Sequence, residues 1–226
     1  MHRIAIIPAR GGSKGVPHKN VRIIHGQPLI VWSIQQARLT PEVDRVIVST
    51  DSWEIAEIAR AAGAEVPDLR PPELALDSTP TEPVLLHVLD AWCPHRTPDV
   101  VILLQPTSPL RLPHAIGNAI RQFDAEQADS LVSVCASHAF FWKKSPNTEA
   151  LYNFKNRPRR QDIHPHDRQY RENGSIYLSK SSGLQQYHNR LFGKIALFEM
   201  TEEESWEIDS ETDLAIVAQL MKEYLP

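Results

Sequence analysis

Short apolar runs alternate with helix-like patterns up to about residue 135, and this alternation constrains the fold more than any other feature. Runs rich in Val, Ile and Leu occupy residues 4–7, 44–50, 100–104 and 130–135. Apolar residues with helical spacing lie between them, at residues 28–39, 52–63, 81–92 and 113–124. Continuous apolar runs of this length are typical of strands buried on both faces. We therefore predict a doubly wound α/β fold with a mostly parallel sheet covered by helices on both faces.

The pattern changes after about residue 137. Residues 138–172 contain several aromatic residues and then a stretch that is dense in arginine and has little periodicity. Such a segment cannot bury itself unaided, so we interpret it as an arm, inserted in a single domain of residues 1–226, that packs on a partner subunit. Regular structure is expected again at residues 175–179, 194–198 and 211–224.

Composition and charge exclude several classes of protein. The net charge of -4 argues against general binding to nucleic acids or membranes. Two cysteines cannot build a disulfide scaffold, and we interpret both as reduced core residues of a cytoplasmic protein. The N-terminal Met-His-Arg runs directly into the first predicted strand, so no signal peptide is expected. No apolar stretch approaches the roughly 18 residues of a membrane span.

A basic, glycine-rich segment, PARGGSKGVPHKN, follows the first predicted strand at residues 8–20. It combines three glycines with Arg10, Lys14 and Lys19 and contains no acidic residue. It matches neither the Walker loop nor the GxGxxG dinucleotide fingerprint. A glycine-rich turn at a strand end can nevertheless aim backbone N–H groups at an anion. We expect a phosphate site here, better matched to a triphosphate than to a monophosphate; a solvated basic loop is the alternative.

Other polar residues should lie close to this segment. The predicted strands at 44–50 and 100–104 end just before Asp51 and Gln105. Ligands of such sheets bind beyond the carboxyl ends of the strands. We therefore expect Arg10, Asp51 and Gln105 to share one rim of the sheet.

Two acidic residues form a second candidate group in SWEIDSETDL, residues 205–214. Glu207 and Asp209 are two residues apart, so in an extended segment both side chains emerge on one face. A pair of carboxylates suits Mg²⁺, which prefers oxygen ligands and usually takes phosphates as partners. The alternative is that these acids are exposed before a helix capped by Ser210 or Thr212.

Arginines dominate a third segment, RRQDIHPHDRQYRENGSIY, at residues 159–177. Its arginines could bind a substrate carboxylate in bidentate fashion, or they could be surface or interface charges. The pair His164 and His166 flanks a proline in a polar loop. We expect these histidines to be exposed to solvent and not to bind a metal.

Six ordered blocks of the sequence resemble those of the acylneuraminate cytidylyltransferases, also called CMP-sialic acid synthetases. They are the opening segment PARGGSKGVPHKN, VSTD at 48–51, LRPPELALD at 69–77, LLQPTSPLR at 103–111, RENGSIY at 171–177 and IDSETDL at 208–214. The resemblance extends from Ile4 to about Leu220. It implies a fold of the nucleotide-diphospho-sugar transferase type, with an arm that exchanges contacts across a homodimer.

The resemblance also implies an activity and a set of site residues. The reaction joins CTP to a nonulosonic acid, with Mg²⁺, by attack of the anomeric hydroxyl on the α-phosphate, and gives a CMP-sugar and pyrophosphate. The nucleotide would be bound by Arg10, Gly11, Ser13, Lys14, Lys19, Asn20, Arg70 and Thr81. The sugar would be bound by Gln105, Lys143, Arg160 and Arg171. Mg²⁺ would be held by Glu207 and Asp209. At position 207 the family commonly has aspartate. The catalytic residues would be Arg10, Lys19 and Asp209.

Several alternatives stay open at this point. The sequence leaves the acceptor open among sialic, legionaminic, pseudaminic and related acids, and the general base open between Asp209 and a metal-bound hydroxide. A nucleotidyltransferase for another sugar acid, or a non-catalytic nucleotide-binding protein that kept the fold, would also fit the sequence. Since the chain ends at Pro226, we expect a single-domain synthetase of bacterial type.

Overall fold

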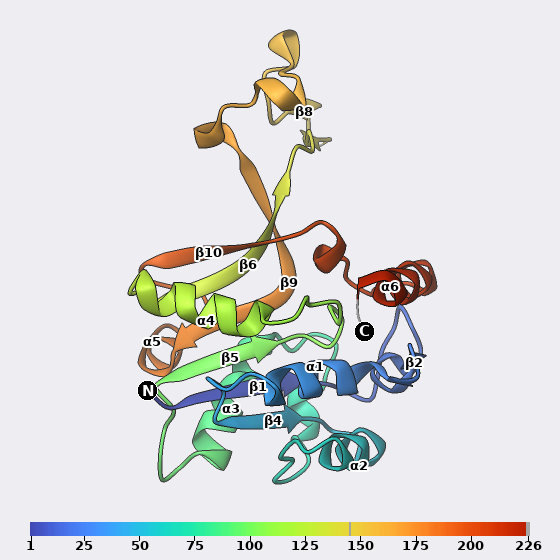
Figure 1. The fold of residues 1–226 in the computed structure, drawn as a ribbon, viewed down its shortest axis with the longest axis vertical. Helices are drawn as coiled ribbons and strands as arrows, with labels where there is room; N and C mark the ends of the chain where they lie inside the picture. The colour runs from blue at the N-terminus through green and yellow to red at the C-terminus, as the bar shows by residue number, and fades with distance from the viewer. Residues whose placement is uncertain (145, 225–226) are drawn as a thin grey trace.

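A six-stranded sheet forms the centre of the molecule (Figure 1). The computed structural model describes residues 1–144 and 146–224. In this sheet the strand order is β10-β6-β9-β5-β1-β4, with β1 at Arg3–Pro8, β4 at Arg45–Ser49, β5 at Val100–Leu104, β6 at Ser130–Ser137, β9 at Gln169–Lys180 and β10 at Ile195–Met200. All neighbours are parallel except β9, which runs antiparallel to both β5 and β6. The prediction of a mostly parallel sheet is confirmed.

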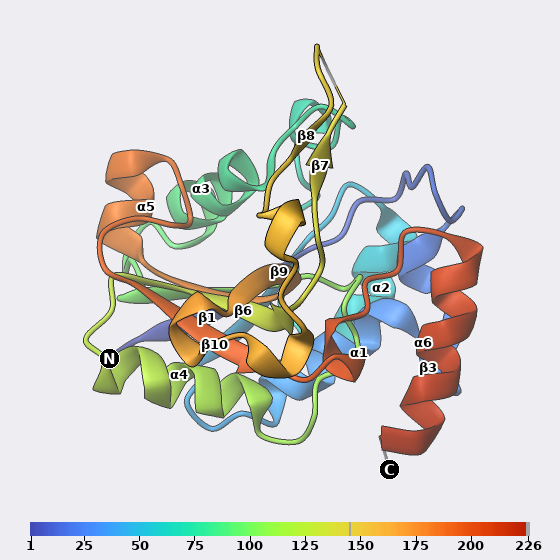
Figure 2. The ribbon, with the colours of Figure 1, turned by 90° about the horizontal axis from the view of Figure 1, so that it is seen from above.

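Helices cover both faces of the sheet (Figure 2). One face packs against α1 (Leu29–Arg38), α2 (Trp53–Ala61) and α4 (Ala115–Ala125). The other face packs against α3 (Thr81–Trp92) and α5 (Ser181–Tyr187). Successive side chains of a strand point to opposite faces of the sheet, so they pack in two different hydrophobic cores. Ile6 packs on the α3 side and Ile7 on the α1 side. The doubly wound α/β prediction is therefore confirmed.

The last helix, α6 (Glu211–Tyr224), lies against the glycine-rich segment. Its Val217 and Met221 share a third apolar cluster with Val16 and Ile24. Ile24 belongs to a small hairpin of β2 (Ile23–Ile24) and β3 (Gln27–Pro28). This cluster joins the segment after β1 to the last helix, beside the sheet. Among the described helices, none has the length and apolar character needed to cross a membrane.

Local signals in the sequence explain where α2 begins and ends. The hydroxyl of Ser52 accepts a hydrogen bond from Ile55 N at 3.4 Å, which is the expected N-cap contact. The helix ends before Gly63, whose φ of +87° is a left-handed conformation that glycine adopts without strain. Both boundaries agree with the sequence prediction.

Two elements differ from the prediction. Strand β9 covers Gln169–Lys180, well beyond the predicted 175–179, because Arg171 and Glu172 pair with the outer part of β6. Helix α5 was not predicted, since Leu184 is the one apolar residue that its short polar sequence buries.

Residues 138–168, called the arm below, project from the sheet between β6 and β9 (Figure 1). They include a short hairpin of β7 (Trp142–Lys143) and β8 (Glu149–Ala150). Phe141 and Trp142 are more than half exposed. The last four residues of the predicted segment 138–172 lie in β9 and belong to the sheet.

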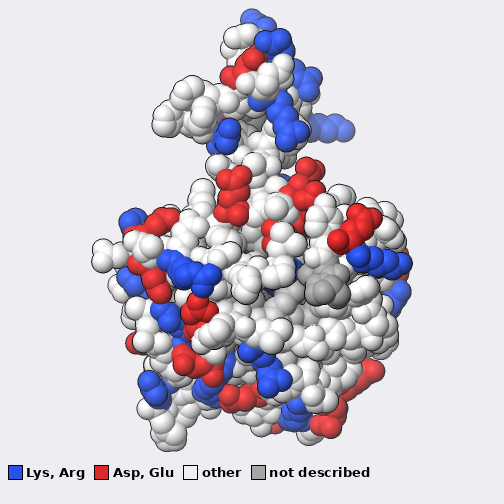
Figure 3. All heavy atoms as spheres, viewed as in Figure 1, with Lys and Arg blue, Asp and Glu red and all other residues white. Residues whose placement is uncertain are grey.

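The arm is basic and the rest of the molecule is acidic. Residues 138–168 contain seven Lys and Arg against three Asp and Glu, a net charge of +4, and the total of -4 leaves -8 for the other residues. Figure 3 shows the Lys and Arg side chains gathered on the arm. The arm and the body are therefore complementary in charge.

Candidate functional site

A cavity of about 510 Å³ opens at the carboxyl ends of β1 and β5. Four segments line it: the glycine-rich segment, residues 70–84, residues 105–107, and the acidic residues Glu207 and Asp209. These segments are far apart in the sequence, and the parallel strands bring them to one rim. The expectation that Arg10 and Gln105 share a rim agrees with this geometry, whereas Asp51, the third residue expected there, does not line the cavity.

The cations of the glycine-rich segment are each held by an acidic residue from elsewhere. Arg10 and Lys14 both pair with Asp77. Lys19 Nζ donates to Ile208 O at 2.6 Å and lies 3.2 Å from Asp209 Oδ1. Asn20 Nδ2 donates to Arg10 O at 3.0 Å, which fixes the start of the segment.

Two glycines of the segment have different surroundings. The N–H of Gly11 donates to Asp51 Oδ1 at 2.9 Å, and Gly11 does not line the cavity. Gly15 packs directly on the carbonyl of Asp209, and any side chain at this position would overlap that carbonyl. Gly15 is thus a position where the close approach of two backbones requires glycine.

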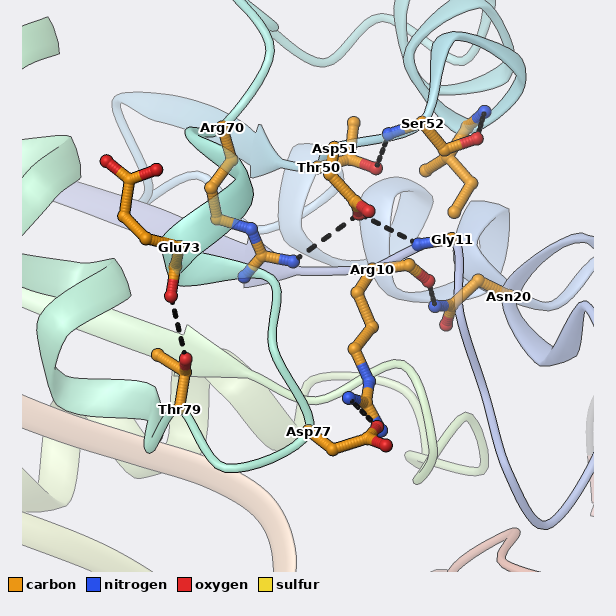
Figure 4. A network of polar contacts seen from close by, with 11 residues as sticks. Arg10, Gly11, Asn20, Thr50, Asp51, Ser52, Arg70, Glu73, Asp77 and Thr79 are labelled. Atoms are coloured by element: carbon orange, nitrogen blue, oxygen red, sulfur yellow. Dashed lines mark hydrogen bonds and ion pairs between the residues drawn. The ribbon is translucent and has the colours of Figure 1, made fainter.

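Arg70 forms part of the wall next to this segment (Figure 4). Its side chain is buried, and Nη2 lies 3.9 Å from Asp51 Oδ1. Burial lowers the pKa of Arg70, and the positive charge of Arg10 lowers it further, while Asp51 opposes both effects. Thr81, at the start of α3, and Ser13 also line the cavity. All the predicted nucleotide-binding residues except Gly11 are therefore brought together here.

Glu207 and Asp209 both line the cavity, as their two-residue spacing suggested. Burial raises the pKa of Glu207, and the negative charge of Asp209 raises it further. Lys19 and Arg171 oppose these effects, so both cations lie near the acidic pair. Ser210 caps the helix that follows, since its hydroxyl accepts from Asp213 N at 3.2 Å.

The acidic pair is suited to Mg²⁺ bound together with phosphates. No cluster of three or more His, Cys, Asp or Glu that could hold a metal occurs within residues 1–144 and 146–224. Two carboxylates beside a cavity lined by cations match the way Mg²⁺ is commonly bound, with substrate oxygens completing its ligands.

Gly174, at a bulge in the sheet, lies beside both Glu207 and Gln105. The register between β6 and β9 shifts between Val132 and Val134, where Ser133 Oγ donates to Asn173 Oδ1 at 2.6 Å. Next to it, Gly174 has a φ of +64°, and a side chain there would overlap Glu207. Bulges commonly redirect side chains beside active sites, and this one leaves room for Glu207.

The predicted sugar-binding residues are divided between the cavity and the arm. Gln105 lines the cavity. Arg171 lies at the base of the arm, where Nη2 donates to Ser205 O at 3.3 Å. Lys143 and Arg160 lie on the arm, exposed to solvent and outside the cavity of their own chain.

Two residues in the structure had no role assigned from the sequence. Asp77 lines the cavity and pairs with its cations. Arg111 is 2% exposed and donates to Ser33 Oγ, Gln36 Oε1, Gln105 O and Ser175 O. Burial lowers the pKa of Arg111 to about 9. Asp77 is the last residue of the block LRPPELALD, and Arg111 is the last residue of LLQPTSPLR. Their places in these two family-like blocks were the only indication of a role in the sequence.

Nearly the whole chain is similar to proteins of a known family. Residues 4–223 match the family model described as "Cytidylyltransferase". The CMP-N,N'-diacetyllegionaminic acid synthase of Legionella pneumophila is 34% identical over 233 residues, which cover 98% of this chain and 97% of that protein. N-acylneuraminate cytidylyltransferase B of Danio rerio is 36% identical over 225 residues, or 96% of this chain and 51% of that protein. The chain thus spans about half the length of its Danio rerio and Oncorhynchus mykiss relatives.

The fold itself is found in a solved structure. CMP:2-keto-3-deoxy-manno-octonic acid synthetase complexed with CTP matches with a TM-score of 0.74 at 20% identity, over 100% of both chains. The likeness shows a shared fold.

Proposed function

Because the chain belongs to the cytidylyltransferase family, we propose that it transfers CMP from CTP to the anomeric hydroxyl of a sialic-type nonulosonic acid and releases pyrophosphate. The observation that carries this proposal is a single cavity in which Arg10, Lys14 and Lys19 lie beside the acidic pair. The near full-length match to a Legionella pneumophila protein named as a CMP-N,N'-diacetyllegionaminic acid synthase supports the class of acceptor.

The cations supply most of the proposed chemistry. Phosphoryl transfer depends on positioning and on stabilising charge that develops on phosphate oxygens. Arg10, Lys14 and Lys19 would bind these oxygens, with Ser13, Asn20 and the backbone near Gly11 completing the segment. Lys19 is already fixed by Ile208 O and Asp209, so it would need little reorganisation. Arg70 and Thr81 would lie near the cytosine and ribose.

Glu207 and Asp209 would hold Mg²⁺ together with the phosphates. The ion would neutralise charge on the phosphate oxygens as pyrophosphate leaves. The protein's own contribution is to keep both carboxylates at the cavity, through Lys19 beside Asp209 and the space that Gly174 leaves for Glu207. The longer side chain of Glu207 is accommodated by this contact with Gly174.

A homodimer forms part of the proposal. Lys143 and Arg160 lie on the arm, away from the cavity of their own chain. The arm carries +4 and the rest of the chain -8, so the arm of one subunit is attracted to the body of another. We propose that these two residues reach the sugar in the partner's cavity, where Arg171 and Gln105 bind it from the other side. A cytoplasmic location is also proposed, since Cys93 and Cys135 are free and buried.

The experiment that tests this function is pyrophosphate release from CTP, with sialic, legionaminic or pseudaminic acid as acceptor. We expect release with one acid, and its loss when EDTA removes Mg²⁺. An octulosonic acid belongs in the panel, because the solved relative is named for such a substrate. Binding of CTP without release of pyrophosphate, whichever acceptor is present, would contradict the proposal. It would favour a non-catalytic nucleotide-binding protein.

A further inference from the structure

Asp77 lies where the cations of the glycine-rich segment point. Its carboxylate is shared: Oδ1 accepts from Arg10 Nη1, and Oδ2 lies 2.6 Å from Lys14 Nζ. All three residues line the cavity. Figure 4 shows the carboxylate of Asp77 facing the end of the Arg10 side chain. Carboxylate and phosphate oxygens bind such cations in the same way, so Asp77 offers these cations what a phosphate would.

Asp77 also joins two loops that border the cavity. Residues 71–80 follow Arg70, whose N–H donates to Thr50 O at 2.7 Å, and lead into α3. The side-chain contact inside this loop is local, from Thr79 Oγ1 to Glu73 O at 2.9 Å. In the part of the chain that the structure describes, the hydrogen bonds and ion pairs between residues 71–80 and 10–20 are those of Asp77. One carboxylate therefore holds the loop to the glycine-rich segment.

A bound triphosphate and Asp77 would compete for the same cations. Hydrogen bonds from Lys14 and Arg10 hold the pKa of Asp77 below its usual range. In the free protein the carboxylate is therefore ionised, and its negative charge repels a phosphate that approaches the same cations. Its side chain is 46% exposed, so it can move into solvent without breaking the core.

We propose that Asp77 is an internal competitor for the phosphate site: it neutralises Arg10 and Lys14 in the free protein, and the nucleotide's phosphates displace it, releasing the loop of residues 71–80. The inference rests on the proposed function, because it takes a nucleoside triphosphate as the ligand of this cavity. A weakly charged anion displaces the carboxylate less effectively than a triphosphate, so the contact favours highly charged ligands.

The test compares binding to the wild-type protein, Asp77→Asn and Glu73→Gln at fixed ionic strength and without Mg²⁺. Titration calorimetry with CTP and with inorganic tripolyphosphate gives the dissociation constants. Glu73→Gln is the matched control, since it removes the same charge from the same loop and its carboxylate points away from Arg10 (Figure 4). We expect Asp77→Asn to tighten both ligands about 3- to 10-fold, the scale of two exposed ion pairs, and Glu73→Gln to change them much less.

Each other result overturns the inference. Weaker binding by Asp77→Asn would mean that the carboxylate positions the cations for phosphate, and equal changes in the two variants would mean a general effect of net charge. Unchanged binding would mean that no competition exists. The proposed function fails separately: a wild-type protein that binds tripolyphosphate but not CTP would contradict it, while the tripolyphosphate data would still decide the role of Asp77. Circular dichroism confirms that both variants are folded.

Discussion

The ion pairs of the cavity and of the arm differ in how far apart their partners lie in the sequence. In the cavity, Lys19 pairs with Asp209 across 190 residues of sequence. In the arm, Arg159 pairs with Asp162, three residues away, and within the described residues no ion pair joins the arm to the body. Long-range ion pairs fix the cavity inside one chain, whereas the ion pair of the arm is local in sequence. The comparison indicates that the cavity is preorganised, and it supports the proposal that the arm packs on a partner subunit.

The largest expected effect breaks the preorganised side of this comparison. Lys19→Ala removes a cation fixed by Ile208 O and Asp209. We expect kcat/KM for pyrophosphate release to fall about 100- to 1,000-fold, the scale for loss of one preorganised donor. Arg22→Ala is the control, because Arg22 pairs with Glu211 outside the cavity. A folded Lys19→Ala variant with near-normal turnover would contradict the proposed role.

Arg111 tests how far buried contacts behind the cavity-lining residue Gln105 contribute to stability. Arg111→Met leaves the carbonyls of Gln105 and Ser175 without their donor, although it also removes the cost of burying a charge. We expect a net loss of about 2–4 kcal/mol in the free energy of unfolding. Urea denaturation measures it, with the exposed Arg121→Met as control. An unchanged midpoint would show that the contacts of Arg111 do no more than offset the cost of burying its charge.

A mixing experiment sharpens the other side, the proposed dependence of the arm on a partner. If Arg160 contacts the substrate as proposed, Arg160→Ala should lower activity about 10-fold or more, the scale for loss of a charged contact. After subunit exchange, a 1:1 mixture of Lys19→Ala and Arg160→Ala should recover roughly a quarter of wild-type activity, because half of the dimers then hold one intact site. An arm that served its own cavity would give no recovery.

The smallest effect concerns a local ion pair of the arm. Arg159→Ala breaks the contact with Asp162, in which both side chains are largely exposed. We expect the free energy of unfolding to change by less than about 0.5 kcal/mol. A larger loss, measured by urea denaturation, would mean that the arm is more tightly integrated than its contacts indicate.

The sequence predicted the parts of the fold that periodicity encodes. Strands β1, β4 and β5 are buried apolar runs, so their positions were readable. The direction of β9 was not, since a buried run has the same pattern whether its neighbours are parallel or antiparallel. Helix α5 buries too few apolar residues to give a helical period.

The site was predictable to the extent that strand ends determine it. Arg10, Lys19 and Gln105 follow two strands that lie side by side, and their convergence follows from that topology. Asp77 and Arg111 lie in irregular segments, and most of their partners are tens of residues away. No local sequence pattern indicates such contacts. The partners of Asp77 and Arg111 were therefore visible only in the structure.

The contact of Gly15 and Lys19 with Asp209 also sets an order of events during synthesis. A ribosome makes Lys19 first and Asp209 190 residues later, a delay of roughly 10 to 40 seconds at ordinary rates of elongation. All six strands of the central sheet precede Asp209 in the chain. Strands β1, β4 and β5 end more than 100 residues before Asp209, so this part of the scaffold can assemble while the acidic wall of the cavity has yet to leave the ribosome. A chain released before residue 209 keeps every strand of that sheet and lacks the carboxylate that fixes Lys19.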